Sequence, residues 1–421
     1  MGLVPELRFP EFRDKGEWKL RLIEDFFLVG SSKRVLQEDW TTQGVPFYRT
    51  RELVSLSKHE PFSSEIFIPE ELFVEISQKY GLPTEGDFLV SGVGTLGISY
   101  QVQEGDRFYF KDGNVLWFKQ KKHIVSNYFK YCFQADGIQN QIFGQSSIST
   151  VGTYTIQNAK KTKFWCPPDL DEQQKIASCL TSIDELVTAQ TKKLDALKTH
   201  KKGLMQQLFP AEGETVPKLR FPEFRDKGEW REKPLNHITT SIFVGTHQTP
   251  KYTVEGIPFF SVENIVSGKT NKFISKDDYL LATSKNKPGK GDVLITRIGN
   301  IGFTTVVDWD YEFSIYVTLA VVKRDERFDS HYLHSFMQSE RYQMEVQSKS
   351  LLNAVPCKIN MDELRKTKVL LPCTEEQQKI ADCLTSVDEL ITAQAQKLDA
   401  LKAHKKGLMQ QLFLAMDEVD A

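Results

Sequence analysis

The feature that most constrains this chain is an internal repeat. The segment LRFPEFRDKGEW occurs at 7–18 and again, letter for letter, at 219–230. A second segment, EQQKIASCLTSIDELVTAQTKKLDALKTHKKGLMQQLF at 172–209, returns nearly unchanged at 376–413. The stretches between these blocks resemble each other only faintly. Two constant frames around two divergent inserts predict a duplicated fold, and a chain of 421 residues has room for two domains with connectors.

Composition is that of an ordinary globular protein, with 40% hydrophobic and 26% charged residues. No apolar run is long enough to cross a bilayer, and the N-terminal sequence lacks a signal-peptide core. We therefore expect a cytoplasmic protein without membrane contact. The six cysteines contain no CxxC pair, which argues against structural zinc and against a disulfide framework.

The net charge of -2 is lower than that of most free-standing DNA-binding proteins, which carry a basic excess. Local basic runs are present at 119–122 (KQKK), 160–163 (KKTK) and 198–202 (KTHKK). Each run taken singly is typical of a solvated surface, so charge alone does not decide whether the chain binds nucleic acid.

The repeated block at 172–209 predicts one long helix, because good helix formers dominate it and no proline interrupts it. Pro167 and Pro168 precede this helix, and Asp171 is the expected N-cap. Apolar residues recur at alternating steps of four and three. The seam predicted for the first helix is Ile176, Leu180, Ile183, Val187, Gln190, Leu194, Leu197, Lys201, Leu204 and Leu208. The seam predicted for the second is Ile380, Leu384, Val387, Ile391, Gln394, Leu398, Leu401, Lys405, Leu408 and Leu412.

A heptad seam of this length favours a coiled coil, with the alternative that each helix packs on its own domain. Only a short linker separates the first helix from the second insert, so paired helices must run antiparallel. The second helix would then return to the start of the chain. Gln190 and Gln394 lie at the helix midpoints and would face each other, fixing the register of the pair.

The predicted fold class is α+β, with two similar β-rich domains separated by an antiparallel coiled coil, pseudo-two-fold and circular in topology. The expected boundaries are 1–168 for the first domain and 169–210 for the first long helix. The second domain follows at 211–372 and the second long helix at 373–421.

The inserts share a faint skeleton. GVPFYRTREL at 44–53 matches GIPFFSVENI at 256–265, and EGDFLVSGVGTLGISYQV at 85–102 matches KGDVLITRIGNIGFTTVV at 290–307. Alternating aromatic and β-branched residues predict mostly short strands. Helices are expected at 126–134 and 329–347.

Nothing in the chain is typical of a catalytic or metal site. Gly92, Gly94 and Gly97 form a GxGxxG pattern, but a strand pattern follows where a dinucleotide site needs a helix, so a tight turn is expected. His331 and His334 have no carboxylate or cysteine at ligand spacing. Walker A, NPPY and nucleophile–base patterns are missing. We expect a non-catalytic chain without metal or cofactor.

The layout resembles the specificity (S) subunit of type I restriction–modification systems over essentially the whole chain. The resemblance is carried by the LRFPEFRDKGEW openings and by PPDLDEQQKIA and PCTEEQQKIA, which lead into the long helices. The two matched segments of the inserts and NAVPCKIN at 353–360 contribute as well.

The resemblance implies that each insert is a target-recognition domain reading one half of a split sequence in double-stranded DNA. The coiled coil would set the gap, and the constant regions would dock two modification subunits. Those subunits bind S-adenosylmethionine and methylate adenine, and ATP-dependent restriction (translocase) subunits complete the complex. This chain would bind neither S-adenosylmethionine nor ATP itself.

The residues expected to contact DNA carry polar or cationic side chains in or beside the shared turns, because base edges are read by hydrogen bonds from such groups. In the first domain they are Arg49, Arg51, Thr95 and the loop Gln145–Ser147, including Ser146. In the second they are Asn264, Arg297, Asn300 and Lys358. The alternative for each is a phosphate contact or a plain surface polar group.

Two other functions fit parts of the sequence. A protein–protein scaffold with two β-rich domains on a coiled coil agrees with the near-zero net charge, and salt-dependent DNA binding would separate it from a DNA reader. A self-contained methyltransferase or nuclease would require the catalytic patterns that the sequence lacks.

Overall fold

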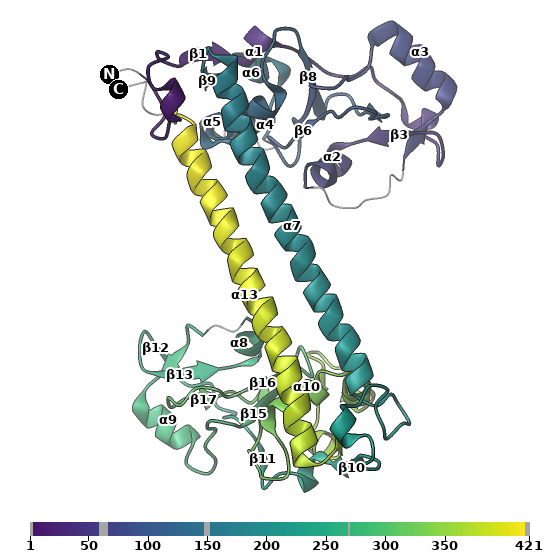
Figure 1. Ribbon diagram of the computed structural model, residues 1–421, viewed down its shortest axis with the longest axis vertical. Coiled ribbons are helices and arrows are strands. Elements are labelled where there is room, and N and C mark those ends of the chain that lie inside the picture. The colour runs from purple at the N-terminus through teal and green to yellow at the C-terminus, as the bar shows by residue number, and fades with distance from the viewer. Residues whose placement is uncertain (1–2, 59–65, 147–151, 268–269, 417–421) are drawn as a thin grey trace. The chain divides into compact units, whose positions relative to one another are not determined.

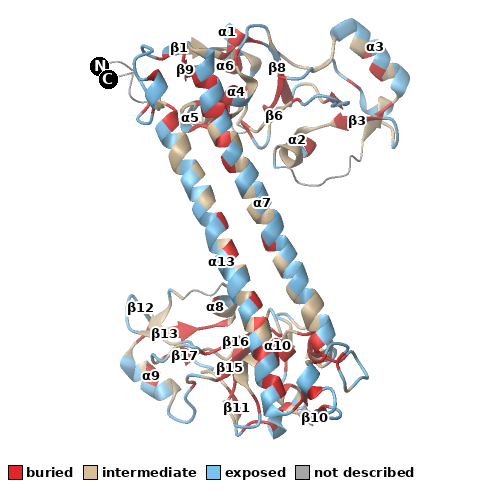
Figure 2. Ribbon diagram, viewed as in Figure 1, coloured by how far each residue is buried: buried red, intermediate tan, exposed pale blue. Residues whose placement is uncertain are grey.

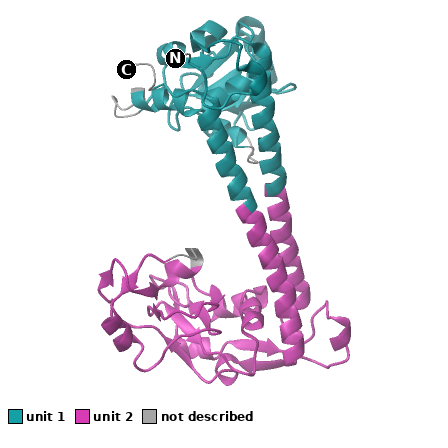
Figure 3. Ribbon diagram, turned by 60° about the vertical axis from the view of Figure 1, so that its left-hand side comes forward, with its two compact units in different colours: residues 1–190, 397–421 teal, residues 191–396 magenta. Residues whose placement is uncertain are grey.

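The computed structural model describes residues 3–58, 66–146, 152–267 and 270–416 (Figure 1). Two compact units emerge, one formed by residues 1–190 with 397–421 and the other by 191–396 (Figure 3). The long helices α7 (Leu170–Leu208) and α13 (Thr374–Leu412) each contribute one half to each unit. Along these stretches of chain, no helix is long and apolar enough to cross a membrane.

The first unit combines its insert with the N-terminal half of α7 and the C-terminal half of α13. Its strands are β1 (Lys19–Leu22), β2 (Phe27–Gly30), β3 (Val45–Tyr48), β4 (Phe67–Ile68), β5 (Phe88–Ser91), β6 (Ser99–Gln101), β7 (Tyr109–Phe110), β8 (Val115–Gln120) and β9 (Lys163–Cys166). Its shorter helices are α1 (Ile23–Phe26), α2 (Thr50–Ser57), α3 (Glu70–Tyr80), α4 (Ser126–Gln134), α5 (Asp136–Ser146) and α6 (Ile156–Lys161).

The second unit repeats this arrangement. Its strands are β10 (Arg231–Pro234), β11 (Ile242–Val244), β12 (Tyr252–Thr253), β13 (Ile257–Phe260), β14 (Phe273–Ile274), β15 (Val293–Thr296), β16 (Thr304–Val306), β17 (Ser314–Ile315), β18 (Leu319–Val322), β19 (Ser350–Leu351), β20 (Lys358–Ile359) and β21 (Lys368–Leu371). Its shorter helices are α8 (Val262–Ser267), α9 (Lys276–Ala282), α10 (Ser330–Met337), α11 (Glu340–Ser348) and α12 (Met361–Arg365).

Most sheet strands of the two units correspond, whereas β12 and the ribbon β19–β20 occur in the second unit alone among the described residues. The central antiparallel sheet has the order β2-β8-β5-β6 in the first unit and β11-β18-β15-β16 in the second. A smaller sheet has the order β4-β3-β7 or β12-β14-β13-β17, with a parallel pair β3–β7 or β13–β17. The ribbon β1–β9 or β10–β21 leads into the following long helix. The predicted duplicated α+β fold is therefore present in both units.

Each unit has a main core in which the sheet and the long helices meet. In the first unit, Phe88 and Phe129 pack in one buried cluster with Ile176, Leu180 and Leu412. The second unit gathers its sheet residues around Leu208, Ile380 and Leu384 in the same way. Because residues of both long helices are buried in each core, the helix ends are integral parts of the domains.

We call residues 3–18 and 215–230 the opening segments. An ion pair, called the clamp below, joins each opening segment to the start of a long helix. Arg8 donates from Nε and Nη2 to the two carboxylate oxygens of Glu172, both at 2.8 Å, and from Nη1 to the carbonyl oxygen of Gly16 at 2.7 Å. Trp18 Nε1 adds a bond of 3.1 Å to Glu172. Arginine and glutamate are both buried. A bidentate, charge-assisted pair of this kind fixes both position and orientation.

The second unit has the same clamp between Arg220 and Glu376, with bonds of 2.8, 2.8 and 2.7 Å that include the Gly228 carbonyl oxygen. The pairing with Glu376 raises the pKa of Arg220. One difference is that Trp230 Nε1 is buried without a hydrogen-bond partner in the described regions.

The same opening segments also contact the end of the other long helix. The backbone N–H of Leu7 donates to the carbonyl oxygen of Gln411, and that of Leu219 to Gln207, both at 2.9 Å. Each opening segment therefore joins the start of one long helix to the end of the other. The predicted return of the second helix to the start of the chain is confirmed.

Within each unit the helix halves run antiparallel. Lys405 of α13 pairs with Asp184 of α7 in the first unit, and Lys201 of α7 pairs with Asp388 of α13 in the second, both at 2.6 Å. The predicted seam positions are all buried or half-buried (Figure 2). Gln394 is buried and Gln190 half-buried. Their mutual contact, and a coiled coil continuous through both units, stay predictions.

Two local expectations were wrong and one was confirmed. The α7 cap is Asp169, not Asp171, because the Asp169 carboxylate accepts the Asp171 N–H at 2.9 Å. The helix expected at 329–347 is split into α10 and α11, since Ser339 caps α11. A serine that can bond the backbone offers it an alternative to a continuous helix. Helix α4 spans 126–134 as predicted.

The clamp yields a stability prediction. Glu172→Gln and Glu376→Gln each remove the carboxylate from a buried arginine and should lower the free energy of unfolding by about 3 kcal/mol. The loss should be larger for Glu172→Gln, because Trp18 also depends on that carboxylate. Urea unfolding measures both, with the exposed Glu375→Gln as the control. Losses below about 1 kcal/mol would contradict the clamp's role.

His334 yields a pH prediction. Its Nδ1 bonds Thr304 Oγ1 at 2.8 Å, and burial, aided by the charge of Lys201, lowers the pKa of His334 from 6.5 to about 4. Above pH 6.5 the imidazole is neutral in both states. As the pH falls from 6.5 towards 4, the unfolded chain takes up a proton that the folded one does not, so stability falls.

The expected loss is roughly 1–3 kcal/mol over this range. His334→Gln should remove that component from the pH profile of urea unfolding, whereas the exposed His404→Gln should not. Parallel profiles for the parent protein and His334→Gln would show that the imidazole does not titrate in this way.

Candidate nucleic-acid interface

A tight turn follows the central strand of each domain. In the first domain, Ser91 Oγ accepts the Ile98 N–H at 2.9 Å and closes a turn that contains Gly94 and Gly97, both at positive φ. This turn joins β5 to β6, as predicted for the GxGxxG pattern. In the second domain, Thr296 Oγ1 accepts the Phe303 N–H at 2.9 Å and closes the equivalent turn.

A glutamine supports each turn from behind. Gln139 of α5 donates to the carbonyl oxygens of Gly97 and Phe133, and Gln343 of α11 donates to those of Gly302 and Met337. Gly97 has a φ of 71°, a backbone conformation that favours glycine, and a Cβ there would also meet Gln139 Oε1 at 2.8 Å. The two domains therefore hold the same turn in the same way.

The start of a short helix lies beside each turn. Thr50, the first residue of α2, donates to the Val93 carbonyl oxygen at 3.4 Å. In the second domain the N–H of Val262, the first residue of α8, donates to Thr318 Oγ1 at 3.2 Å, and Thr318 also accepts the Arg297 N–H. The turn and the helix start form one local surface in each domain.

The first-domain arginines share a carboxylate at this helix start. Arg49 bonds Glu52 at 2.6 Å and Arg51 bonds it at 3.1 Å. Burial would raise the pKa of Glu52, but the hydrogen bonds from Arg49 outweigh this effect and hold that pKa below its usual value. Arg51 remains largely exposed, so its guanidinium can reach an external partner while Glu52 keeps Arg49 in place.

The other first-domain candidates divide between the turn and α5. Thr95 is exposed at the tip of the turn. Gln145 and Ser146 belong to the end of helix α5 rather than to the expected loop, because the helix runs to Ser146. The side chains of these two residues, and Ser147, lie outside the described part of the chain.

In the second domain, Asn264 has a structural role. Its side chain is 6% exposed, and its Oδ1 accepts the Ser261 N–H at 2.6 Å. Glu52 does the same for the Arg49 N–H, so the two residues are equivalent helix caps. Because its Oδ1 already serves the cap, Asn264 is less available for base contact than Arg297, whose guanidinium is incompletely bonded. The S-x-x-N spacing before an apolar residue was the sequence signal for this cap.

Arg297, Asn300 and Lys358 are brought together. Arg297 and Asn300 lie in the turn between β15 and β16, and Asn300 is exposed there. Lys358 is the first residue of β20 and forms a β-bridge with Ile298 in the turn. The next residue, Ile359, donates its backbone N–H to the Arg297 carbonyl oxygen. Three of the four candidates of this domain thus share one surface.

Arg297 is unusual because it is only 9% exposed and some hydrogen-bond donors of its guanidinium have no acceptor among the described residues. Nη1 donates to the Val317 carbonyl oxygen at 3.1 Å, while Nε has no hydrogen-bond partner among the described residues. Burial lowers the pKa of this guanidinium. At the equivalent position of the first domain, a Cβ on Gly92 would meet the Tyr154 carbonyl oxygen at 2.8 Å, so an arginine cannot be accommodated there.

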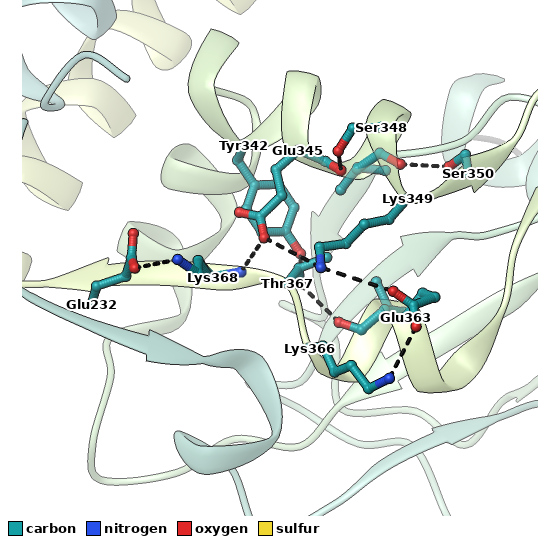
Figure 4. Close-up of polar contacts among 12 residues, drawn as sticks. Glu232, Tyr342, Glu345, Ser348, Lys349, Ser350, Glu363, Lys366, Thr367 and Lys368 are labelled. Carbon is teal, nitrogen blue, oxygen red and sulfur yellow. Dashed lines mark hydrogen bonds and ion pairs between the residues drawn. The ribbon is translucent and has the colours of Figure 1, made fainter. Parts of the chain in front are cut away.

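A polar cluster supports the strands that carry Lys358 (Figure 4). Glu345 accepts the Lys368 N–H at 3.0 Å, and Tyr342 bonds Thr367 at 3.0 Å. Ser350, the first residue of β19, donates to the Val346 carbonyl oxygen at 2.6 Å. Burial raises the pKa of Glu345. These bonds tie α11 to β21 and hold the β19–β20 hairpin.

The described residues contain no cluster of side chains that could hold a metal ion, and all six cysteines are free. His334 bonds Thr304, and His331 lies 3.4 Å from Asp308. The chemistry available at the shared turns is hydrogen bonding and positive charge. Sequence reasoning missed the apolar loop between β19 and β20, which borders this surface.

Two near-identical frames, each presenting the same turn with different side chains, define a class of duplicated recognition proteins. The family model of the type I restriction modification DNA specificity domain matches the chain twice, at residues 15–199 and 228–403. The chain therefore belongs to the family of type I restriction–modification specificity subunits.

Named relatives agree with this assignment. The chain is 23% identical to the MjaVIII specificity subunit of Methanocaldococcus jannaschii, over 97% of this chain and 93% of that protein. It is 31% identical to a putative type I restriction enzyme specificity subunit of Haemophilus influenzae, over 39% of this chain and 40% of that protein.

Solved structures share the fold. The S subunit of a type I system from M. genitalium superposes with a TM-score of 0.61 at 13% identity, covering 98% of this chain and 100% of that one. A chain from a study of complex assembly and conformational transition of the type I R-M system gives 0.58 at 17% identity, covering 94% and 97%.

The buried guanidinium yields a prediction. Arg297→Met removes an incompletely bonded charge from a buried position while keeping much of the side-chain volume. We expect the free energy of unfolding to rise by about 1 kcal/mol. Urea unfolding measures the change, and Arg51→Met, at an exposed arginine, is the control. A loss of stability in Arg297→Met would show that the bond to Val317 outweighs the cost of burial.

Proposed function

We propose that this chain is the DNA-reading subunit of a type I complex acting in the cytoplasm. Each recognition domain reads one half of an asymmetric, bipartite sequence. The observation that carries this proposal is the pair of equivalent turns on near-identical frames, with Gly92 and Thr95 in one turn and Arg297 and Asn300 in the other. Equal scaffolds with different side chains suit the reading of two different half-sites.

The paired helices set the distance between the half-sites. Helices α7 and α13 have 39 residues each and are about 58 Å long at about 1.5 Å per residue. That length is sufficient to hold two reading heads about one DNA turn, roughly 34 Å, apart. A buried glutamine at the seam, Gln394, supports a fixed register.

The constant frames dock two copies of a modification subunit. Exposed apolar side chains recur at equivalent positions, with Leu186 and Leu390 on the helices and Val4 and Val216 in the opening segments. Repeated apolar contacts suit two identical partners. Those partners bind S-adenosylmethionine and methylate adenine, and ATP-dependent restriction subunits complete the complex.

Exposure and existing contacts narrow the set of residues that we propose to contact DNA. Thr95, Arg51 and Asn300 are exposed, and Arg297 and Lys358 adjoin the second turn. Arg49 acts mainly through its pair with Glu52. Asn264 is left out because it is buried as a cap.

The first test is a map of methyladenine in the source genome with and without this gene. We expect one bipartite, asymmetric motif to lose methylation on deletion, which also reveals both half-sites. If no motif changes while the modification subunit is expressed and active, the reader role fails. Salt-insensitive DNA binding of the purified complex would instead favour a protein scaffold.

Matched variants test the division between the domains. Arg297→Ala should relax or abolish recognition of one half-site, and Thr95→Ala should affect the other. A single lost base contact costs about 1–3 kcal/mol, which corresponds to roughly a tenfold to hundredfold loss of affinity. The methylated motif of each variant is the measurement. Equal loss at both half-sites, or no change, would contradict these assignments.

A further inference from the structure

Three apolar side chains are exposed at the end of β19 and in the loop that leads to β20. Leu351 is 48% exposed, Leu352 59% and Val355 101%. We call residues 351–355 the apolar tip. Exposed apolar residues scattered singly are normal, but three within five residues, beside a candidate binding surface, point to an apolar partner.

The apolar tip is held firmly at its base. Leu351 pairs with Lys358 across the hairpin, and the Ala354 N–H donates to the Leu351 carbonyl oxygen at 3.2 Å. On the other side, the Gly299 N–H donates to the Cys357 carbonyl oxygen at 2.9 Å, and Cys357 Sγ contacts the Gly299 carbonyl oxygen at 2.9 Å. The tip is thereby fixed to the turn between β15 and β16.

Arg297 and Lys358 lie beside the apolar tip, and neither forms an ion pair within the described part of the chain. The ion pairs of the neighbouring cluster join Lys349 and Lys366 to Glu363 and leave out Arg297 and Lys358. Arg297 is also buried with its Nε unpartnered within the described regions. Both cations therefore keep charge and hydrogen-bonding capacity for a ligand.

We propose that the apolar tip inserts Leu352 and Val355 into the base stack of the DNA at or beside the second half-site. This inference rests on the proposed function. A duplex offers phosphates to Arg297 and Lys358 and, on unstacking, apolar base faces to the tip. A protein surface would have to supply both an apolar pocket and separate carboxylates.

The proposed insertion concerns the half-site read by the second domain. Counted back from the bridges Val93–Thr153 and Ile298–Lys358, the sequence SSISTVG at 146–152 corresponds to LLNAVPC at 351–357. The first sequence is mainly polar and the second mainly apolar. The apolar sequence of the tip is therefore a feature of the second domain.

The test uses the complete methyltransferase complex on DNA that carries the motif identified from the genome map. Permanganate reactivity of thymines reports unstacking at each half-site. The modification subunit flips its target adenine and so exposes the thymine opposite it in either half-site. The wild-type complex should in addition make other thymines at or beside the second half-site hyper-reactive. The double variant Leu352→Ala with Val355→Ala should lose this signal and bind about tenfold more weakly.

A matched control removes equally exposed apolar groups elsewhere in the same unit. Val254 is 98% exposed and Leu281 69%, so Val254→Ala with Leu281→Ala changes the same residue types. This control should keep both hyper-reactivity and affinity. All four substituted side chains are solvent-exposed, so thermal melting of the complexes should be unchanged.

Three results separate the outcomes. Hyper-reactivity of these additional thymines that persists in the tip variant, or is missing from an active wild-type complex, overturns the insertion. Loss of the modification subunit from the tip variant, with DNA distortion unchanged, overturns it in favour of protein docking. A wild-type complex that does not methylate a bipartite motif contradicts the proposed function itself.

Discussion

The structure depends on the buried pair between an opening-segment arginine and the glutamate at the start of a long helix. Arg8 and Glu172 form it in the first unit, and Arg220 and Glu376 in the second. Removing either partner leaves an uncompensated buried charge, which few proteins tolerate. The same segment also bonds the end of the other helix through its backbone. The repeated blocks are alike because they bind each other.

The two recognition domains share the side-chain hydrogen bonds that hold the turn in place. A hydroxyl from Ser91 or Thr296 closes the turn, and Gln139 or Gln343 supports it from behind. These contacts involve backbone atoms, which are present whatever the neighbouring side chains are. The remaining positions of the turn are free to differ. Divergence of the inserts and constancy of their scaffold are therefore compatible.

Sequence alone predicted the features that depend on periodicity and repetition. The long helices, their antiparallel halves and the turn at Gly94–Gly97 followed from spacing and connectivity. The break at Ser339 did not, because helix propensity on either side is similar and only the cap decides it. The cap formed by Asn264 did not follow from the sequence for a related reason. An amide can cap a helix or read a base, and only the hydrogen bond to Ser261 reveals the cap.

The two domains manage positive charge beside the turn in opposite ways. In the first, Arg49 and Arg51 share the carboxylate of Glu52, so a phosphate or base must compete with an existing ion pair. In the second, Arg297 has no such partner among the described residues, and its burial costs stability before any ligand arrives. A ligand that supplies an acceptor recovers this cost, so the second domain gains more from binding. Selection for stability alone would remove both this guanidinium and the apolar tip beside it. Their presence at one end of one domain is best explained by a partner that satisfies both.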